Sequence, residues 1–198
     1  MRNAEATRER ILEAALGEFS AHGIAGARVD RIAHAAGCNK NLIYVYFEDK
    51  ESLFTTVLLK HLMRIHDEEP FTPDDLPIYA GKVFDFAVAN PDLMRLMAWS
   101  ALEQKPEGHA ERVATLEEKI RALAEAQKTG RVGTAFPPGF LVIAVMSLAM
   151  AWSAAGTFAS LQPKAERSAD LRRNIIEAVR LLSKAGKGVR AARKTKSR

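Results

Sequence analysis

The side chains whose types and spacing best suit binding chemistry lie in residues 39–50, NKNLIYVYFEDK. An asparagine amide can pair bidentately with adenine, lysine can reach guanine, and leucine or valine can pack on a thymine methyl. Phenolic hydroxyls and lysine suit phosphate oxygens, which position a protein on a duplex without reading its sequence. The alternative is an ordinary solvated helix face. The candidates for contact with double-stranded DNA are Lys40, Asn41, Leu42, Tyr44, Val45, Tyr46 and Lys50.

Two short helices joined at a glycine are predicted to present these side chains. Val29, Ile32 and Ala36 recur at helical spacing, so the first helix carries one apolar stripe and one polar face. Gly37 follows directly, and glycine ends helices because it enters the left-handed conformation without a side-chain penalty. The first helix is therefore expected to stop at this turn.

The second helix is predicted over about residues 40–47. Asn39 can cap it through the side-chain oxygen, and Ile43 and Phe47, one turn apart, form its inner side. Asp49 can cap a third helix behind the first two. This order of elements predicts a helix-turn-helix, whose second helix enters the major groove of DNA.

The segments VDRIAHAAG and NKNLIYVYFEDKESLF resemble the DNA-binding domain of the TetR/AcrR family of bacterial transcriptional regulators. The resemblance covers residues 7–60, with TRERILEAALGEFSAHG as the first helix and its exit. It implies that Tyr44, Tyr46 and Lys50 contact the DNA backbone. It also implies that Lys40 and the two residues after it meet base edges.

Four positions depart from the pattern that the family shows. Arg28 replaces a common threonine, which removes a hydroxyl cap and adds a phosphate partner. Cys38 stands where an aliphatic residue is usual, Asn39 where serine is frequent, and Asn41 where glycine is common. These departures bear on which operator sequence is bound. Arg28 and Asn39 complete the predicted DNA-binding set.

The net charge of +5 is not a property of the predicted DNA-binding region. Residues 184–198 hold seven basic side chains and no acidic one, whereas residues 1–60 hold eight of each sign. Duplex binding must therefore come from the local placement of basic groups. The single cysteine, Cys38, excludes a disulfide framework and fits a reducing cytoplasm, and the charged start MRNAEATRER shows no signal peptide.

The chain as a whole is predicted to be all-α, with about nine helices and no internal repeat, because no stretch alternates with a period of two. We expect a helix-turn-helix domain over 1–50, a helical regulatory and dimerisation domain over 51–184 that begins with a connecting helix over 51–66, and a basic, disordered tail over 185–198. The remaining helices are expected at 7–20, 78–89, 92–104, 109–129, 139–160 and 167–184.

Residues 134–161 contain no charged side chain, a length that could span a bilayer. Prolines, serines and a glycine inside the stretch, and the lack of a second such stretch, favour a buried helix. The family resemblance implies that the last two helices, over about 139–160 and 167–184, pair across a two-fold axis in a homodimer.

The C-terminal region is rich in methionine and aromatic residues. Each of these side chains alone is explained by an ordinary core, but methionine also adapts to irregular cavities. With the family precedent, the set predicts a pocket for an apolar or amphipathic small molecule. The candidate lining residues are Phe84, Met94, Met97, Trp99, Met146, Met150 and Trp152.

No nucleophile elbow, phosphate-binding glycine loop or metal-ligand pattern appears in the sequence, so we expect neither catalysis nor a cofactor. The sequence therefore predicts a cytoplasmic bacterial transcription factor, a ligand-responsive repressor that binds a palindromic operator as a homodimer. Two other interpretations stay open. One is a membrane-associated helical protein, and the other is a small-molecule-binding module without specific DNA binding.

Overall fold

The computed structural model describes residues 2–68, 70–103, 109–156 and 168–184. Within these ranges every regular element is helical, which confirms the predicted fold class. The elements are α1 (Arg2–Gly26), α2 (Val29–Ala36), α3 (Lys40–Phe47), α4 (Lys50–Glu68), the 3-10 helix η1 (Pro73–Asp75), α5 (Leu76–Ala89), α6 (Pro91–Leu102), α7 (His109–Lys128), α8 (Pro138–Met150) and α9 (Ser168–Ser183).

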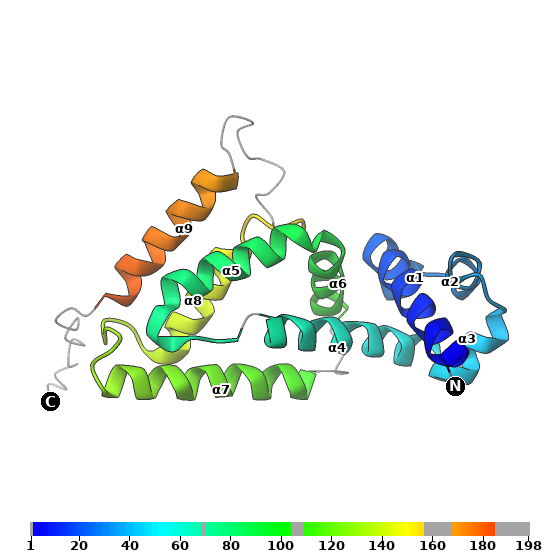
Figure 1. Ribbon diagram of the computed structural model, residues 1–198, viewed down its shortest axis with the longest axis horizontal. Coiled ribbons are helices and arrows are strands. Elements are labelled where there is room, and N and C mark those ends of the chain that lie inside the picture. Colours follow the sequence, from blue (N-terminus) through cyan, green and yellow to red (C-terminus); the bar gives the residue numbers. More distant parts are fainter. Residues whose placement is uncertain (1, 69, 104–108, 157–167, 185–198) are drawn as a thin grey trace, which may run out of the picture.

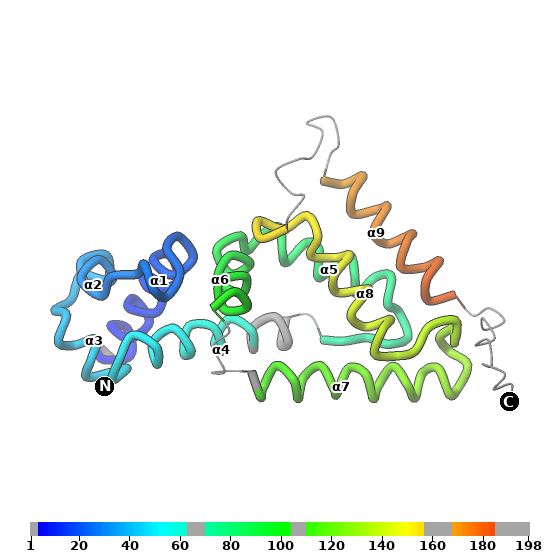
Figure 2. The backbone as a smooth tube through the Cα atoms, turned by 180° about the vertical axis from the view of Figure 1, so that it is seen from behind, coloured from blue at the N-terminus to red at the C-terminus, as the bar shows by residue number. Residues whose placement is uncertain are grey.

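The helices form two groups along the long axis of the molecule (Figure 1). Helices α1, α2 and α3 gather at one end, which we call the head, and α4 runs from the head toward the remaining helices. Helix α6 stands between the head and the group formed by α5, α7, α8 and α9. Seen from behind, α9 lies at the outer edge, where it packs mainly on α5 (Figure 2).

Two hydrophobic cores match this arrangement. The core of the head contains the inner stripes of α1 to α4, and it continues into the end of α5 and into α6 through Phe86, Leu93 and Leu96. The second core joins α5 to α7, α8 and α9. Because α6 contributes to the core of the head, the head and the C-terminal helices meet through packed side chains rather than through a linker.

Two predicted helices differ from the observed ones. Helix α1 begins at Arg2 rather than at residue 7, and it continues past residue 20 to Gly26 with an interruption at Gly23. Helix α8 ends at Met150, so the prediction of a helix over 139–160 was too long. After Met150 the chain tightens into turns, in which Ser153 N–H donates to the Met150 carbonyl oxygen at 3.0 Å. The predicted disordered tail lies outside the described residues.

Candidate nucleic-acid interface

The turn between α2 and α3 has the predicted geometry. Gly37 adopts a left-handed conformation (φ 63°, ψ 43°), and its N–H donates to the carbonyl oxygen of His34 at 3.1 Å. Asn39 then caps α3, because its Oδ1 accepts from the N–H of Asn41 at 2.9 Å. These bonds set the angle at which α3 leaves α2, and they occupy the amide oxygen of Asn39.

Helix α3 has one packed side and one solvent-facing side. Ile43 and Phe47 are buried in the core of the head, as predicted. On the outward side Asn41 is exposed, Tyr44 is 41% exposed and Val45 is 76% exposed. An amide, a phenol and a methyl-bearing side chain thus share one free surface, and they suit adenine, a phosphate and a thymine methyl respectively.

Four other predicted contact residues lie on α3 or at the start of α4. Lys40 is paired with Asp30, with 2.9 Å between Nζ and Oδ1, and this hydrogen bond raises the pKa of the lysine. The Tyr46 hydroxyl donates a hydrogen bond to the backbone carbonyl oxygen of Ala4 in α1 at 3.3 Å. The Lys50 ammonium donates to the backbone carbonyl oxygen of Ala27, also at 3.3 Å. Each lysine ammonium has further N–H donors available for a phosphate. Tyr46 has a single O–H donor, so it must break its present hydrogen bond before it can donate to a phosphate. Leu42 is half-buried.

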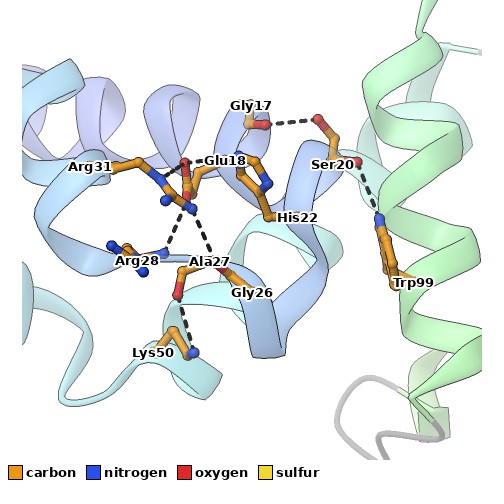
Figure 3. A network of polar contacts seen from close by, with 10 residues as sticks. All are labelled: Gly17, Glu18, Ser20, His22, Gly26, Ala27, Arg28, Arg31, Lys50 and Trp99. Atoms are coloured by element: carbon orange, nitrogen blue, oxygen red, sulfur yellow. Dashed lines mark hydrogen bonds and ion pairs between the residues drawn. The ribbon is translucent and has the colours of Figure 1, made fainter.

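Glu18 of α1 fixes the position of α2 (Figure 3). Its carboxylate accepts from the backbone N–H of Arg28 at 2.8 Å and from the Arg31 guanidinium at 2.8 Å. Arg28, the N-cap residue of α2, provides no side-chain cap, and Glu18 holds its backbone N–H from another helix. Burial raises the pKa of the Glu18 carboxyl, but the hydrogen bonds from Arg31 and Arg28 outweigh it and lower this pKa below its ordinary value.

The bond to Glu18 involves the backbone of Arg28 and not its side chain. This guanidinium is exposed, and it has no ion pair or hydrogen bond with any other residue that the structure describes. It lies at the start of α2, and in helix-turn-helix proteins the first helix of the motif crosses the DNA backbone. Arg28 is therefore the most available cation of the predicted set for a phosphate contact.

The connection from α3 to α4 is a tight γ-turn. Glu48 adopts φ 63° and ψ −60°, and Asp49 N–H donates to the carbonyl oxygen of Phe47 at 2.6 Å. This turn is rare and strained for a residue with a side chain. Asp49 then caps α4 as predicted, because its Oδ1 accepts from Ser52 N–H at 2.7 Å. The turn fixes α4 relative to the exposed face of α3.

A polar junction ties the head to α6. Gly23 (φ 65°, ψ −178°) interrupts α1, so the helical bond from Ile24 N–H to the carbonyl oxygen of Ser20 is absent. Trp99 of α6 and Glu103, the residue directly after α6, satisfy the two groups. Trp99 Nε1 donates to the Ser20 oxygen at 3.2 Å, and Glu103 Oε1 accepts from Ile24 N–H at 2.9 Å. Figure 3 shows the indole of Trp99 reaching α1 from α6.

The structure divides the predicted ligand-pocket residues. Met94, Met97 and Met150 line one hollow between α6, α7 and the turn after α8. Trp99 lies instead at the junction with α1, where its indole nitrogen is bonded. The other three pack with the second core: Phe84 is fully buried, and Met146 and Trp152 are partly buried.

One charged residue of the C-terminal helices was missed by the sequence analysis. Lys119 of α7 donates to the Tyr79 hydroxyl at 2.9 Å, and its ammonium lies 5.5 Å from the Tyr79 ring and 5.9 Å from the Phe71 ring. Burial lowers the pKa of this lysine. Helical periodicity contained the signal, because Lys119 falls between Leu116 and Leu123 on the inner stripe of α7.

Two further findings concern the described residues only. None of their helices is long and apolar enough to cross a membrane. No three histidine, cysteine or acidic side chains among them gather into a possible metal site. Cys38 is partly buried and packs against the core of the head.

The fold and the exposed face of α3 define a helix-turn-helix DNA-binding protein. The family profile for bacterial regulatory proteins of the tetR family matches residues 11–57, and the profile for the tetracyclin repressor-like C-terminal domain matches residues 75–180. The chain therefore belongs to the TetR family, and it is a DNA-binding transcriptional regulator.

Individual relatives agree with this assignment. The HTH-type transcriptional repressor SCO4008 of Streptomyces coelicolor is 39% identical over 152 residues, which cover 75% of this chain and 79% of that protein. The HTH-type transcriptional regulator RutR of Escherichia coli K12 is 27% identical over 175 residues, 83% of this chain and 79% of that protein.

Solved structures agree as well. The structure of the transcriptional regulator SCO4942 from Streptomyces coelicolor superposes with a TM-score of 0.81 at 35% identity, covering 91% of this chain and 99% of that one. FadR from Bacillus subtilis in complex with stearoyl-CoA shares the fold, with a TM-score of 0.66 at 18% identity, covering 86% and 96% of the two chains. Nothing in the comparisons supports a membrane-associated protein or a module without DNA binding.

Proposed function

We propose that this regulator is a ligand-responsive repressor that binds a roughly palindromic operator as a homodimer in the bacterial cytoplasm. The observation that carries the proposal is the exposed face of α3, where Asn41, Tyr44 and Val45 point away from the head. The name of the repressor SCO4008 supports repression as the direction of control. In a dimer, the two copies of α3 must lie about 34–36 Å apart to enter successive major grooves.

The residues proposed to position the head on phosphates are Arg28, Lys40, Tyr44, Tyr46 and Lys50. The residues proposed to meet base edges are Lys40, Asn41, Leu42 and Val45, while Asn39 holds the start of α3. This division follows from chemistry, because charged and phenolic tips suit phosphate oxygens and amides or methyl groups suit base edges.

We propose that the dimer forms through α8 and α9. Phe140 and Ile143 of α8 are 56% and 53% exposed, and Leu181 of α9 is 65% exposed. Exposed large apolar side chains on these two helices are suited to an interaction surface. The expected result is a dimer by light scattering for the wild type and a monomer for Ile143→Asp. Val88→Asp, an exposed position on α5, is the matched control and is expected to stay dimeric.

Helix α6 offers a physical route from a ligand to the DNA. It carries Met94 and Met97 on the hollow and Trp99 at the junction with α1, and Glu103 of the junction follows directly after it. A ligand changes DNA affinity only if it binds the DNA-incompetent arrangement more tightly than the competent one. A small movement of α6 on ligand binding would break or shift both junction bonds and so tilt the head.

The test of DNA binding is the selection of fragments of bacterial genomic DNA by the purified protein, followed by sequencing. The expected result is a recurrent two-fold-symmetric motif. The double variant Asn41→Ala, Tyr44→Ala is expected to recover no such motif, whereas Arg121→Gln, an exposed change on α7, recovers the same motif as the wild type. Failure of the wild type to enrich any motif would overturn the proposal.

A further inference from the structure

An unpaired arginine lies on the wall of the methionine-lined hollow. The hollow measures about 220 Å³, and Arg112 of α7 lines it together with Met94, Met97 and Met150. Arg112 is half-buried, and it makes no ion pair, hydrogen bond or ring contact with any residue that the structure describes. A guanidinium that presents five N–H donors without an acceptor is a natural partner for an anion.

Arg112 differs in this respect from its neighbours. Between residues 70 and 184, every other arginine that the structure describes is paired with a carboxylate. These pairs are Arg95 with Asp92, Arg121 with Glu117, Arg131 with Asp74, Arg172 with Asp85, Arg173 with Asp170, and Arg180 with Glu177. Arg112 is thus the one described arginine of this region without a carboxylate partner among the described residues.

A second polar group of the same hollow also lacks a partner. Ser153, in the turn after α8, is only 4% exposed, and its hydroxyl makes no hydrogen bond with any described residue. A buried hydroxyl without a hydrogen bond costs about 1–3 kcal/mol, so such groups are expected to be satisfied by water or by a ligand. Ser153 lines the hollow together with Arg112, and the remaining lining residues are apolar or small.

From these observations we infer the chemical class of the ligand, which rests on the proposal that the regulator is ligand-responsive. The ligand is a small amphipathic anion. Its carboxylate or phosphate group pairs with Arg112, and its apolar part lies against Met94, Met97 and Met150. Pockets for drug-sized ligands measure about 300–1,000 Å³. The smaller hollow therefore suits a short molecule rather than a long acyl chain.

The test is a calorimetric titration of the full-length protein with four probes: hexanoate, hexyl phosphate, hexanol and hexylamine. The wild type is compared with Arg112→Gln and with Arg121→Gln. Arg121 is an exposed arginine on the same helix, so it is the control for loss of one positive charge. Operator binding without any probe is measured for each protein, so that a failure of DNA binding is recognised separately.

The expected result is that at least one anionic probe binds the wild type and Arg121→Gln about tenfold more tightly than hexanol does. Arg112→Gln is expected to lose this difference, because a charge-assisted bidentate contact is worth about tenfold or more in affinity. The inference is overturned if neither anion binds more tightly than hexanol, or if Arg112→Gln binds the anions as the wild type does. Absence of operator binding by the unliganded wild type would instead contradict the proposed function.

Discussion

The indole nitrogen of Trp99 donates a hydrogen bond to the carbonyl oxygen of Ser20, 79 residues earlier in the chain, at 3.2 Å. This bond replaces one that α1 loses at Gly23. Glu103 accepts from Ile24 N–H, the other half of the lost bond. At the interruption, α1 loses one internal backbone hydrogen bond, and the two freed groups bond instead to Trp99 and Glu103. The interruption explains why a glycine occurs near the end of a long helix.

Replacing Gly23 is predicted to lower the stability of the fold. Gly23→Ala would place a methyl carbon 2.7 Å from Glu103 Oε1 and 2.9 Å from a ring carbon of Trp99, at a φ of 65°. A backbone with φ 65° and ψ −178° is essentially confined to glycine, and it costs about 1–3 kcal/mol for other residues. We expect the free energy of unfolding, measured in urea, to fall by about 2 kcal/mol or more. Gly17→Ala is the control on the same helix. It meets nothing within 4 Å, and it is expected to stabilise by about 0.5–1 kcal/mol.

The turn after α3 is predicted to be relieved by a glycine. Glu48→Gly removes the side chain from a backbone with φ 63° and ψ −60°, a conformation that costs about 1–3 kcal/mol for a residue with a Cβ atom. We expect the melting temperature to rise. Glu48→Ala removes the same charge but keeps the Cβ atom, and it is expected to leave the melting temperature unchanged. Equal effects of the two substitutions would argue against backbone strain.

The stabilisation of α2 by Glu18 is predicted to depend on pH. The pKa of Glu18 is lowered in the folded protein, so its stabilising effect is complete above the unfolded pKa and is lost as the pH falls through the folded value. At pH 7, Glu18→Gln is expected to lower the unfolding free energy by about 1.5–3 kcal/mol. The deficit is expected to shrink below about pH 4, near the ordinary pKa of glutamate.

Urea unfolding at several pH values measures this deficit. Glu13→Gln, an exposed position on the same helix, is the matched control and is expected to change the unfolding free energy by less than about 0.5 kcal/mol. A deficit for Glu18→Gln that stays constant between pH 7 and pH 3 would show that the charge of the carboxylate is not what holds α2.

The half-buried Lys119 gives a pH dependence of the same sign at more alkaline pH, but it arises from an unfavourable effect of burial. Burial lowers its pKa in the folded protein, so the unfolded chain binds more protons between the folded value and the ordinary value. Stability contributed at this site therefore rises with pH across that interval. Lys119→Met removes the charge and keeps an apolar stem, so the variant is expected to be at least as stable as the wild type at pH 7.

The measurement is urea unfolding of both proteins from pH 7 to pH 10. Any advantage of Lys119→Met is expected to narrow as the pH rises, because the wild-type lysine loses its proton. Lys128→Met, an exposed change on the same helix, serves as the control for general effects of pH. An advantage that widens toward pH 10 would contradict a lowered pKa for Lys119.

Features that depend on neighbouring residues were predicted from the sequence. The left-handed turn at Gly37 and the caps at Asn39 and Asp49 were correct, because each is decided within about four residues. The end of α8 was not predicted. Its uncharged composition continues past Met150, and only tertiary contacts decide where such a helix stops.

Contacts between distant segments could not be predicted. Nothing near Trp99 in the sequence indicates that its indole meets the carbonyl of Ser20, and this contact removes Trp99 from the predicted pocket set. Likewise, no local pattern shows that Arg112 lacks a carboxylate while its neighbours have one. Most of the candidate DNA-binding residues lie on α3, because the helix was predicted from local signals, and their contact with DNA stays a prediction.

The exposed face of α3 is proposed to read DNA while basic groups beside it hold phosphates. The most direct test measures affinity for the selected operator, its point variants and random DNA at several salt concentrations, with wild type, Lys50→Ala and Asn41→Ala. Lys50→Ala is expected to weaken binding to all duplexes and to reduce the salt slope by about two per dimer, whereas Asn41→Ala changes base preference and keeps the slope. The proposed division of roles would be contradicted if the two variants changed affinity, base preference and salt slope alike, or if both kept the wild-type affinity.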